Sequence, residues 1–162
     1  LKATGGVPSP FDNWILLRST KTLGLRYQRS SDNANELADW LSNNYNLLRI
    51  IYPGLKSHPQ HDIAKKQQRT PTDEIIFGNM ISIEVKTIEA RDQFIKRLEV
   101  FTLAESLGGV ESLCCIPYNM THSAVPVKAK LEMGITETLI RLSIGIEDIA
   151  DLKTDLINGL AK

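Results

Sequence analysis

Arg141 is the residue whose setting most clearly points to chemistry. It lies in residues 139–146, which are otherwise mostly apolar, and alternation places it on one face of a predicted strand with Ser143 and Gly145. A guanidinium within such a strand needs a partner, because an unpaired buried charge is strongly disfavoured. An internal carboxylate would meet that need, and so would the carboxylate of a bound ligand held by two parallel hydrogen bonds. The residues alone leave both alternatives open.

The segment 105–112 reads Glu-Ser-Leu-Gly-Gly-Val-Glu-Ser and is the second unusual feature. Gly108 and Gly109 allow a tight bend and a close approach of the backbone to a ligand. Hydroxyl and carboxylate groups, including those of Glu105 and Ser106, flank the glycines. A plain β-turn explains the glycines equally simply, and no Gly-rich phosphate-binding spacing is present.

Two segments that contain histidine are weaker candidates. His58 and His61 are three residues apart, a spacing that can bind a metal, but no third ligand is nearby and Pro59 marks a helix start. We therefore predict no metal site. Residues 120–123, Met-Thr-His-Ser, form a polar loop, and a hydrolase triad is disfavoured because no Gly-x-Ser-x-Gly nucleophile elbow occurs.

Hydrophobic periodicity predicts the elements that hold these residues. A stripe of Ala34, Leu37, Ala38 and Leu41 marks one face of a long helix. We predict helices over residues 10–18, 22–42, 58–67 (with Ser57 as N-cap), 88–98, 128–133 and 148–161, and strands over 47–52, 80–86, 113–116 and 139–146. Helices alternating with strands indicate a two-layer α/β domain. Residues 1–45 are predicted to form a linker and long connecting helices, and residues 46–162 a small α/β domain with a four-stranded sheet.

Composition excludes several classes of function. The 162 residues carry 19 basic and 19 acidic side chains, so no long-range field attracts nucleic acid or an anionic membrane. No apolar run reaches the length of a membrane span. Cys114 and Cys115 are adjacent and are the only cysteines, so neither a disulfide framework nor a CxxC zinc site is available. A reducing, cytoplasmic setting fits this cysteine usage.

Several motifs together resemble the Cys/Met-metabolism family of pyridoxal phosphate (PLP)-dependent enzymes. They run in the family's order: Val-Pro-Ser-Pro-Phe-Asp at 7–12, Tyr-Pro-Gly-Leu at 52–55, Ser-His-Pro-Gln-His at 57–61, residues 101–113, Met-Thr-His at 120–122 and Arg-Leu-Ser-Ile-Gly-Ile-Glu-Asp at 141–148. The resemblance covers nearly the whole chain. It implies the fold-type I, aspartate-aminotransferase-like architecture, of which this chain would supply the arm helices and the C-terminal domain.

The resemblance also assigns roles to four residues. It implies that Arg141 binds the α-carboxylate of an amino-acid substrate, that Ser106 stands beside the cofactor and that carboxylate, and that Thr121 supports the arginine. Glu105 suits cystathionine, because a carboxylate there can pair with the ammonium group at the far end of that substrate and disfavour apolar thioethers.

The implied activity is that of a cystathionine γ-lyase, which uses PLP in the γ-elimination of cystathionine to cysteine, 2-oxobutanoate and ammonia. A cystathionine γ-synthase or related C–S lyase, and a truncated non-catalytic module for assembly, remain alternatives. Family members form homotetramers. The lysine that carries PLP belongs to a motif expected upstream of Leu1, so we assign no catalytic residue and expect a fragment that is inactive alone.

Overall fold

The computed structural model describes residues 5–161, so the first four residues of the predicted linker lie outside the described range. The helices are α1 (Pro10–Thr20), α2 (Leu23–Asn44), α3 (His61–Gln67), α4 (Ile88–Arg97), α5 (Val127–Glu132) and α6 (Ile149–Leu160). The strands are β1 (Arg49–Ile51), β2 (Met80–Glu84), β3 (Thr102–Leu103), β4 (Leu113–Cys115) and β5 (Leu139–Ser143). Each predicted helix and strand is therefore present, with shifted ends.

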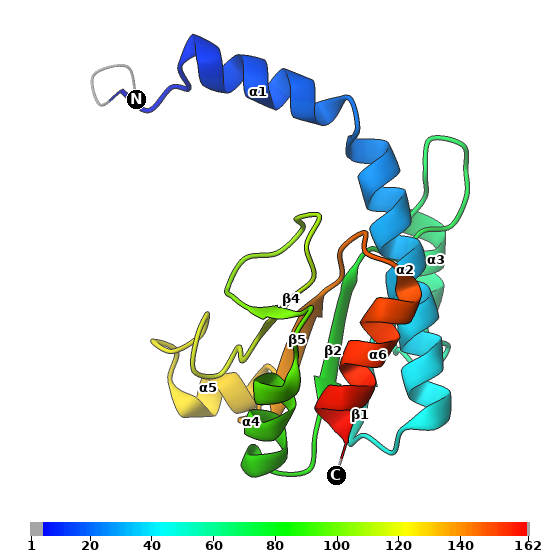
Figure 1. The fold of residues 1–162 in the computed structure, drawn as a ribbon, viewed down its shortest axis with the longest axis vertical. Helices are drawn as coiled ribbons and strands as arrows, with labels where there is room; N and C mark the ends of the chain where they lie inside the picture. The colour runs from blue at the N-terminus through cyan, green and yellow to red at the C-terminus, as the bar shows by residue number, and fades with distance from the viewer. Residues whose placement is uncertain (1–4, 162) are drawn as a thin grey trace.

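The two arm helices differ in what they bury. Helix α1 begins with a capping box in which Ser9 and Asp12 each bond to the backbone of the other, yet α1 buries no residue. It projects from the rest of the molecule (Figure 1). Helix α2 buries the predicted stripe of Ala34, Leu37, Ala38 and Leu41 completely. Its second half thus belongs to the core, whereas α1 does not.

The sheet has five strands in the order β1-β2-β5-β4-β3, so the prediction of four strands was wrong. The additional strand, β3, has two residues and pairs parallel to β4, whereas every other pair in the sheet is antiparallel. Two exposed residues are too few to show alternation, which is why the sequence pattern does not predict this strand.

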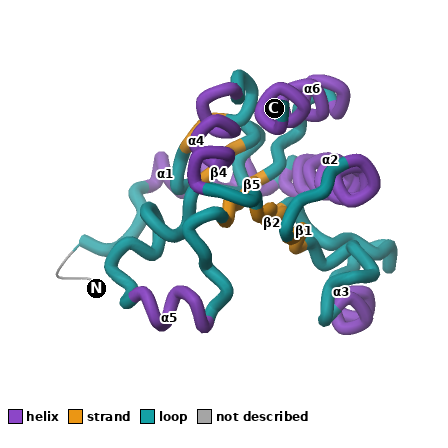
Figure 2. The backbone as a smooth tube through the Cα atoms, turned by 90° about the horizontal axis from the view of Figure 1, so that it is seen from below, coloured by secondary structure: helices purple, strands orange, loops and turns teal. Residues whose placement is uncertain are grey.

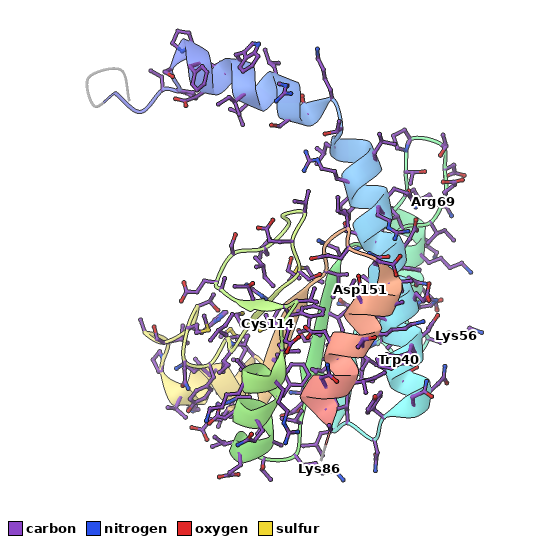
Figure 3. All side chains as sticks on the ribbon, viewed as in Figure 1. Trp40, Lys56, Arg69, Lys86, Cys114 and Asp151 are labelled. Carbon is purple, nitrogen blue, oxygen red and sulfur yellow. The ribbon has the colours of Figure 1, made fainter. Side chains whose placement is uncertain are left out.

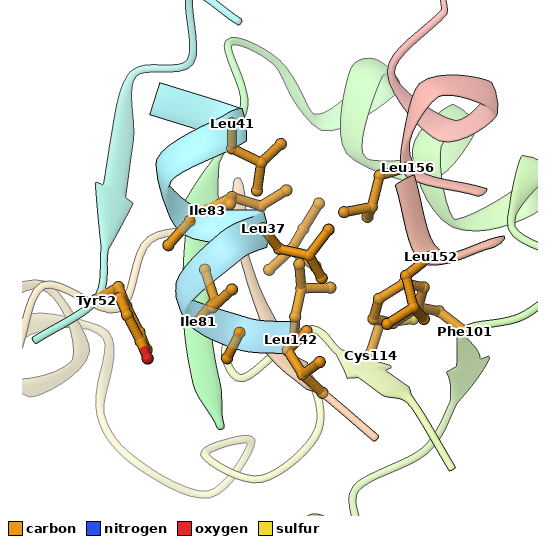
Figure 4. Packing of buried hydrophobic residues seen from close by; sticks show 14 of the residues in the cluster. Leu37, Leu41, Tyr52, Ile81, Ile83, Phe101, Cys114, Leu142, Leu152 and Leu156 are labelled. Atoms are coloured by element: carbon orange, nitrogen blue, oxygen red, sulfur yellow. The ribbon is translucent and has the colours of Figure 1, made fainter. Parts of the chain in front are cut away.

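The two faces of the sheet have different compositions. On one face, Ile81, Ile83, Ile140 and Leu142 pack against α2, α4 and α6, which lie along that side in Figure 2. Figure 4 shows the side chains of α2 and α6 converging on β2 and β5. Cys114 points into the same apolar layer (Figure 4). The other face carries Arg141, and α5 lies on that side of the sheet.

Helix α3 begins later than predicted. Residues 55–61 form two successive turns, closed by bonds from the His58 amide to the Leu55 carbonyl and from the His61 amide to the His58 carbonyl. The helix then starts at His61 with Gln60 as its N-cap, so the prediction that Ser57 caps it was wrong. Within residues 5–161, no helix has the length and apolar character needed to cross a membrane.

Candidate functional site

Arg141 occupies the middle of β5, between two neighbouring strands. Its cross-strand partners are Ser82 on β2 and Cys115 on β4, so the three side chains share the face opposite the apolar core. Cys115 is 1% exposed, and Arg141 itself is half-buried. The sheet therefore holds the root of the arginine rigidly while its guanidinium remains accessible.

The guanidinium is tethered by the main chain. Its Nη2 donates to the carbonyl oxygen of Glu105 at 2.8 Å and lies 3.5 Å from that of Ser106. None of the ion pairs among residues 5–161 includes Arg141, and its Nε and Nη1 have no acceptor in that range. An internal carboxylate, one of the two partners considered from the sequence, is thus not found within the described residues.

Glu105 and Ser106 contact Arg141 through their main-chain carbonyl oxygens, and both residues are exposed. The environment of Cys115 reports on the nearby charges. Burial raises the pKa of the Cys115 thiol, Arg141 acts to lower it, and Glu105 acts to raise it. Arg141 and Glu105 thus act in opposite directions on this buried thiol.

Residues that anchor the glycine segment were not predicted. Ser143 Oγ accepts from the Gly108 amide at 3.0 Å, and the Glu147 carboxylate accepts from the Ser112 amide and hydroxyl. Ser143 stood on the same predicted face as Arg141, so alternation could have marked it. Nothing in the pattern around Glu147 distinguishes it from a surface carboxylate.

Thr121 bonds to its neighbour in the chain. Its Oγ1 is 2.8 Å from His122 Nδ1, and its hydroxyl makes no hydrogen bond with Arg141 among the described residues. The loop that carries it is fastened by Lys130, whose Nζ donates to the Tyr118 carbonyl at 2.9 Å and lies 4.3 Å from the centre of the Tyr118 ring. Support of the arginine by Thr121 stays a prediction.

The two histidines near α3 have separate partners. His61 Nδ1 bonds to the Pro53 carbonyl at 2.8 Å, and His58 Nδ1 accepts from the Gln60 amide at 3.2 Å. Within residues 5–161, no group of three or more His, Cys, Asp and Glu side chains is arranged to hold a metal ion.

The fold and this site together define a class of protein. An α/β domain that fixes one arginine beside a glycine segment, with two of its nitrogens lacking an acceptor in the described chain, is suited to bind the carboxylate of a small molecule.

The chain belongs to the Cys/Met metabolism PLP-dependent enzyme family, whose sequence profile matches residues 1–161. It is 48% identical over 155 residues to a cystathionine β-lyase of Coxiella burnetii (strain RSA 493 / Nine Mile phase I), covering 95% of this chain and 38% of that protein. It is 46% identical over 158 residues to a cystathionine γ-lyase of Bacillus subtilis (strain 168), covering 98% and 40%. This chain therefore spans about 40% of the length of such relatives.

Solved structures confirm the predicted fold class. Cystathionine γ-lyase from yeast superposes with a TM-score of 0.89 at 42% identity, covering 98% of this chain and 40% of that one. A cystathionine γ-synthase from Xanthomonas oryzae pv. oryzae in complex with cystathionine gives 0.88 at 41%, with the same coverage. The chain has the α/β fold of a fold-type I domain.

PLP is the cofactor of this family. Lys130 is the one buried lysine within residues 5–161, and carbonyls of Tyr118 and Ser123 accept from its Nζ. The other lysines of this range are not buried. We therefore assign no step of PLP chemistry to these residues, and the upstream position of the PLP lysine stays a prediction.

Proposed function

We propose that this chain is the substrate-carboxylate-binding portion of a PLP-dependent cystathionine γ-lyase, which releases cysteine, 2-oxobutanoate and ammonia from cystathionine, and that it is inactive alone. The observation that carries the proposal is the Arg141 guanidinium, which two main-chain carbonyls orient and no described carboxylate neutralises. An α-carboxylate supplied by the substrate completes this arrangement.

The role of Arg141 is to orient the substrate. A planar guanidinium binds a carboxylate through two parallel hydrogen bonds, which fix the direction of the amino acid as well as its position. Fixed orientation of the bonds around Cα is a large part of the catalytic advantage in amino-acid chemistry. The tether to residues 105 and 106 restricts the arginine before the ligand arrives, so less side-chain entropy is lost on binding.

Glu105 gives the proposal its substrate class. Its side chain is exposed and forms no ion pair within the described residues, which leaves the carboxylate available for the distal ammonium group of cystathionine. The relatives include β-lyases and γ-synthases, so a β-lyase or a γ-synthase is the second candidate. A γ-lyase forms 2-oxobutanoate from cystathionine, whereas a β-lyase forms pyruvate.

A chimeric enzyme tests the proposal. This chain replaces the 158 matching residues of the Bacillus subtilis cystathionine γ-lyase, and 2-oxobutanoate and pyruvate are measured with cystathionine as substrate. We expect 2-oxobutanoate. Arg141→Ala should lower kcat/KM about 10²- to 10³-fold, the loss expected for one charge-assisted bidentate contact.

The PLP absorbance of the chimera separates loss of substrate binding from loss of folding. Arg141→Ala should retain the same PLP content. Arg69→Ala is the control variant, because Arg69 is an exposed arginine that pairs with Asp73 and not with the Arg141 loop, and it should retain normal turnover. Normal cystathionine turnover by the Arg141→Ala enzyme would overturn the carboxylate assignment, and pyruvate as the sole keto acid would favour the β-lyase.

Glu105→Val tests the substrate preference in the same chimera. Removal of the carboxylate should lower kcat/KM for cystathionine about tenfold and raise the relative use of methionine, because the distal ammonium loses its partner. The ratio of the two kcat/KM values is the measurement, with Glu111→Val as the matched change in the same loop. An unchanged ratio would show that Glu105 is a solvated side chain with no role in substrate preference.

A further inference from the structure

The orientation of Arg141 depends on the position of the loop whose carbonyls accept its hydrogen bonds. Residues 104–112, which we call the Arg141 loop, connect β3 to β4 and are mostly exposed. Glu105 and Ser106 lie near the start of this loop, and no packing of their own side chains holds them in place. The Ala104 amide holds the start of the loop by donating to the Cys114 carbonyl at 2.9 Å, and the rest of the loop is held by bonds from residues 108–112.

Five hydrogen bonds fix the Arg141 loop to the end of β5 and the residues that follow it. The Gly108 amide donates to Ser143 Oγ at 3.0 Å, and the Ile146 amide donates to the Val110 carbonyl at 2.9 Å. The other three bonds involve Ser112, and two of them go to the Glu147 carboxylate. Gly108 has φ of +75°, a conformation that favours glycine, so the first bond also depends on residue type.

Both oxygens of the Glu147 carboxylate are used. Glu147 Oε1 accepts from the Ser112 amide at 2.5 Å, and Oε2 accepts from the Ser112 hydroxyl at 2.9 Å. The same hydroxyl accepts from the Gly145 amide at 2.9 Å. Ser112 is fully buried, so both of its donors depend on this carboxylate.

The segment after β5 is itself held from behind by α2. Asn33, which is buried, donates from Nδ2 to the carbonyls of Gly145 at 3.1 Å and Glu147 at 3.0 Å. A Cβ at position 145 would collide with the Val110 carbonyl oxygen and the Glu147 carboxylate, so only glycine permits this close approach. The anchoring groups therefore rest on the rigid core.

We propose that the Glu147 carboxylate and the Ser143 hydroxyl are positioning groups for amino-acid binding, because they hold the Arg141 loop so that its carbonyls keep the guanidinium ready for a carboxylate. Neither group touches the guanidinium through any hydrogen bond in the described chain. They act through the loop. This inference rests on the proposed function for its ligand, but the geometry it describes belongs to the chain itself.

The test uses the 162-residue chain, with Glu147→Gln as the variant and Glu111→Gln as the control. Glu111 is an exposed carboxylate in the same loop and makes no hydrogen bond there among the described residues. Amide hydrogen exchange at Gly108 and Ser112, and the NMR signal of the Arg141 Nε–H group, are the measurements. Glu147→Gln should accelerate exchange about tenfold or more and shift the Arg141 signal. Glu111→Gln should change neither.

A titration with L-cystathionine, followed by the same Arg141 signal, adds the functional measurement. We expect the Kd to rise about tenfold in Glu147→Gln while core amides such as that of Ile83 exchange as before. Unchanged loop exchange and an unchanged Arg141 signal would overturn the inference. Failure of the unmodified chain to bind L-cystathionine would count against the proposed function alone, because the exchange comparison still decides the positioning role.

Ser143→Ala covers the case in which Glu147→Gln does not fold. It removes only the acceptor of the Gly108 amide, so we expect faster exchange at Gly108 and a displaced Arg141 signal. If Ser143→Ala leaves the Arg141 signal where it is in the unmodified chain, the inference is wrong.

Discussion

Glu84 shows how this chain neutralises a charge that it does not present to a ligand. The residue is 7% exposed, and its carboxylate accepts from Arg49 Nε and from the hydroxyls of Thr136 and Thr138. Arg141 lies on the neighbouring strand without a described carboxylate partner. The contrast between the two charged residues supports a ligand-binding role for Arg141 and a structural role for Glu84.

The pH dependence of stability should reveal this role of Glu84. Burial acts to raise the pKa of its carboxyl, but the hydrogen bonds from Thr136 and Arg49 and the charge of Arg49 outweigh it and hold the pKa below its usual value. A lowered folded-state pKa stabilises the fold above the unfolded-state pKa, and this stabilisation is lost as the pH falls through the folded-state pKa.

Glu84→Gln should therefore lower the free energy of unfolding by about 1–3 kcal/mol at neutral pH, and the difference from the unmodified chain should shrink in acid. Urea unfolding between neutral and acidic pH measures both effects. Glu137→Gln removes an exposed carboxylate beside the same two threonines and should change little. A pH-independent difference would show that shape rather than charge matters at Glu84.

Asp155 is a second buried carboxylate with a structural role, because it holds the segment that connects α4 to β3. Although it lies on α6, its carboxylate accepts from the amides of Glu99, Val100 and Phe101 at 2.7, 3.0 and 2.9 Å. It is 2% exposed. These bonds fix the chain between α4 and β3, which is the approach to the Arg141 loop.

Replacement of Asp155 by Asn should lower the free energy of unfolding by about 2–3 kcal/mol. One accepting oxygen of the side chain becomes an NH2 group, which faces backbone N–H donors and cannot accept from them. Thermal unfolding measures the loss. The control is Asp151→Asn, an exposed carboxylate on the same helix, which should stay within about 0.5 kcal/mol of the unmodified chain. Equal stability of the two variants would contradict the anchoring role.

The elements that the sequence pattern predicts well are those with many residues of one periodicity. The stripe of α2 and the alternation of β5 are both long enough to be recognised, and β5 correctly placed Arg141 and Ser143 on one face. Strand β3 was missed because two residues carry no period. The start of α3 was misplaced because a preceding turn competes with the helix for the same backbone groups.

The site was predictable only in part for a related reason. Arg141 and the segment 105–112 are unusual within their own surroundings, so they stand out in the sequence. The contacts of Ser112 with Glu147 join residues 35 positions apart, and their residue types are ordinary. The same holds for Thr121, whose distance from Arg141 depends on the tertiary path of a loop and not on any local pattern.

Across the whole molecule, the exposed apolar residues gather on the arm. Helix α1 carries the exposed side chains of Phe11, Trp14, Ile15, Leu16 and Leu17. Figure 3 shows that side chains project from α1 in several directions and that no other element lies along this helix. A helix that is apolar on all sides is normally buried. Elsewhere, exposed apolar residues are more widely spaced, with Val127 and Leu131 on α5 as one pair and Ile63 on α3 alone, which is usual for a folded surface.

The isolated chain should therefore associate through α1, because contiguous exposed apolar surface drives association in water. In a Trp40→Phe background, Trp14 is the only tryptophan of the chain and reports directly on this helix. Its emission should shift to shorter wavelength as concentration rises, while light scattering gives a mass above 18.1 kDa.

Trp14→Ser in the unmodified chain should restore the monomer mass without changing the thermal midpoint, since α1 buries nothing. Ile63→Ser, which removes one isolated exposed side chain, should leave the association unchanged. A mass of 18.1 kDa and a solvent-exposed Trp14 spectrum at every concentration would contradict this prediction, because the chain would then stay monomeric despite the apolar surface of α1.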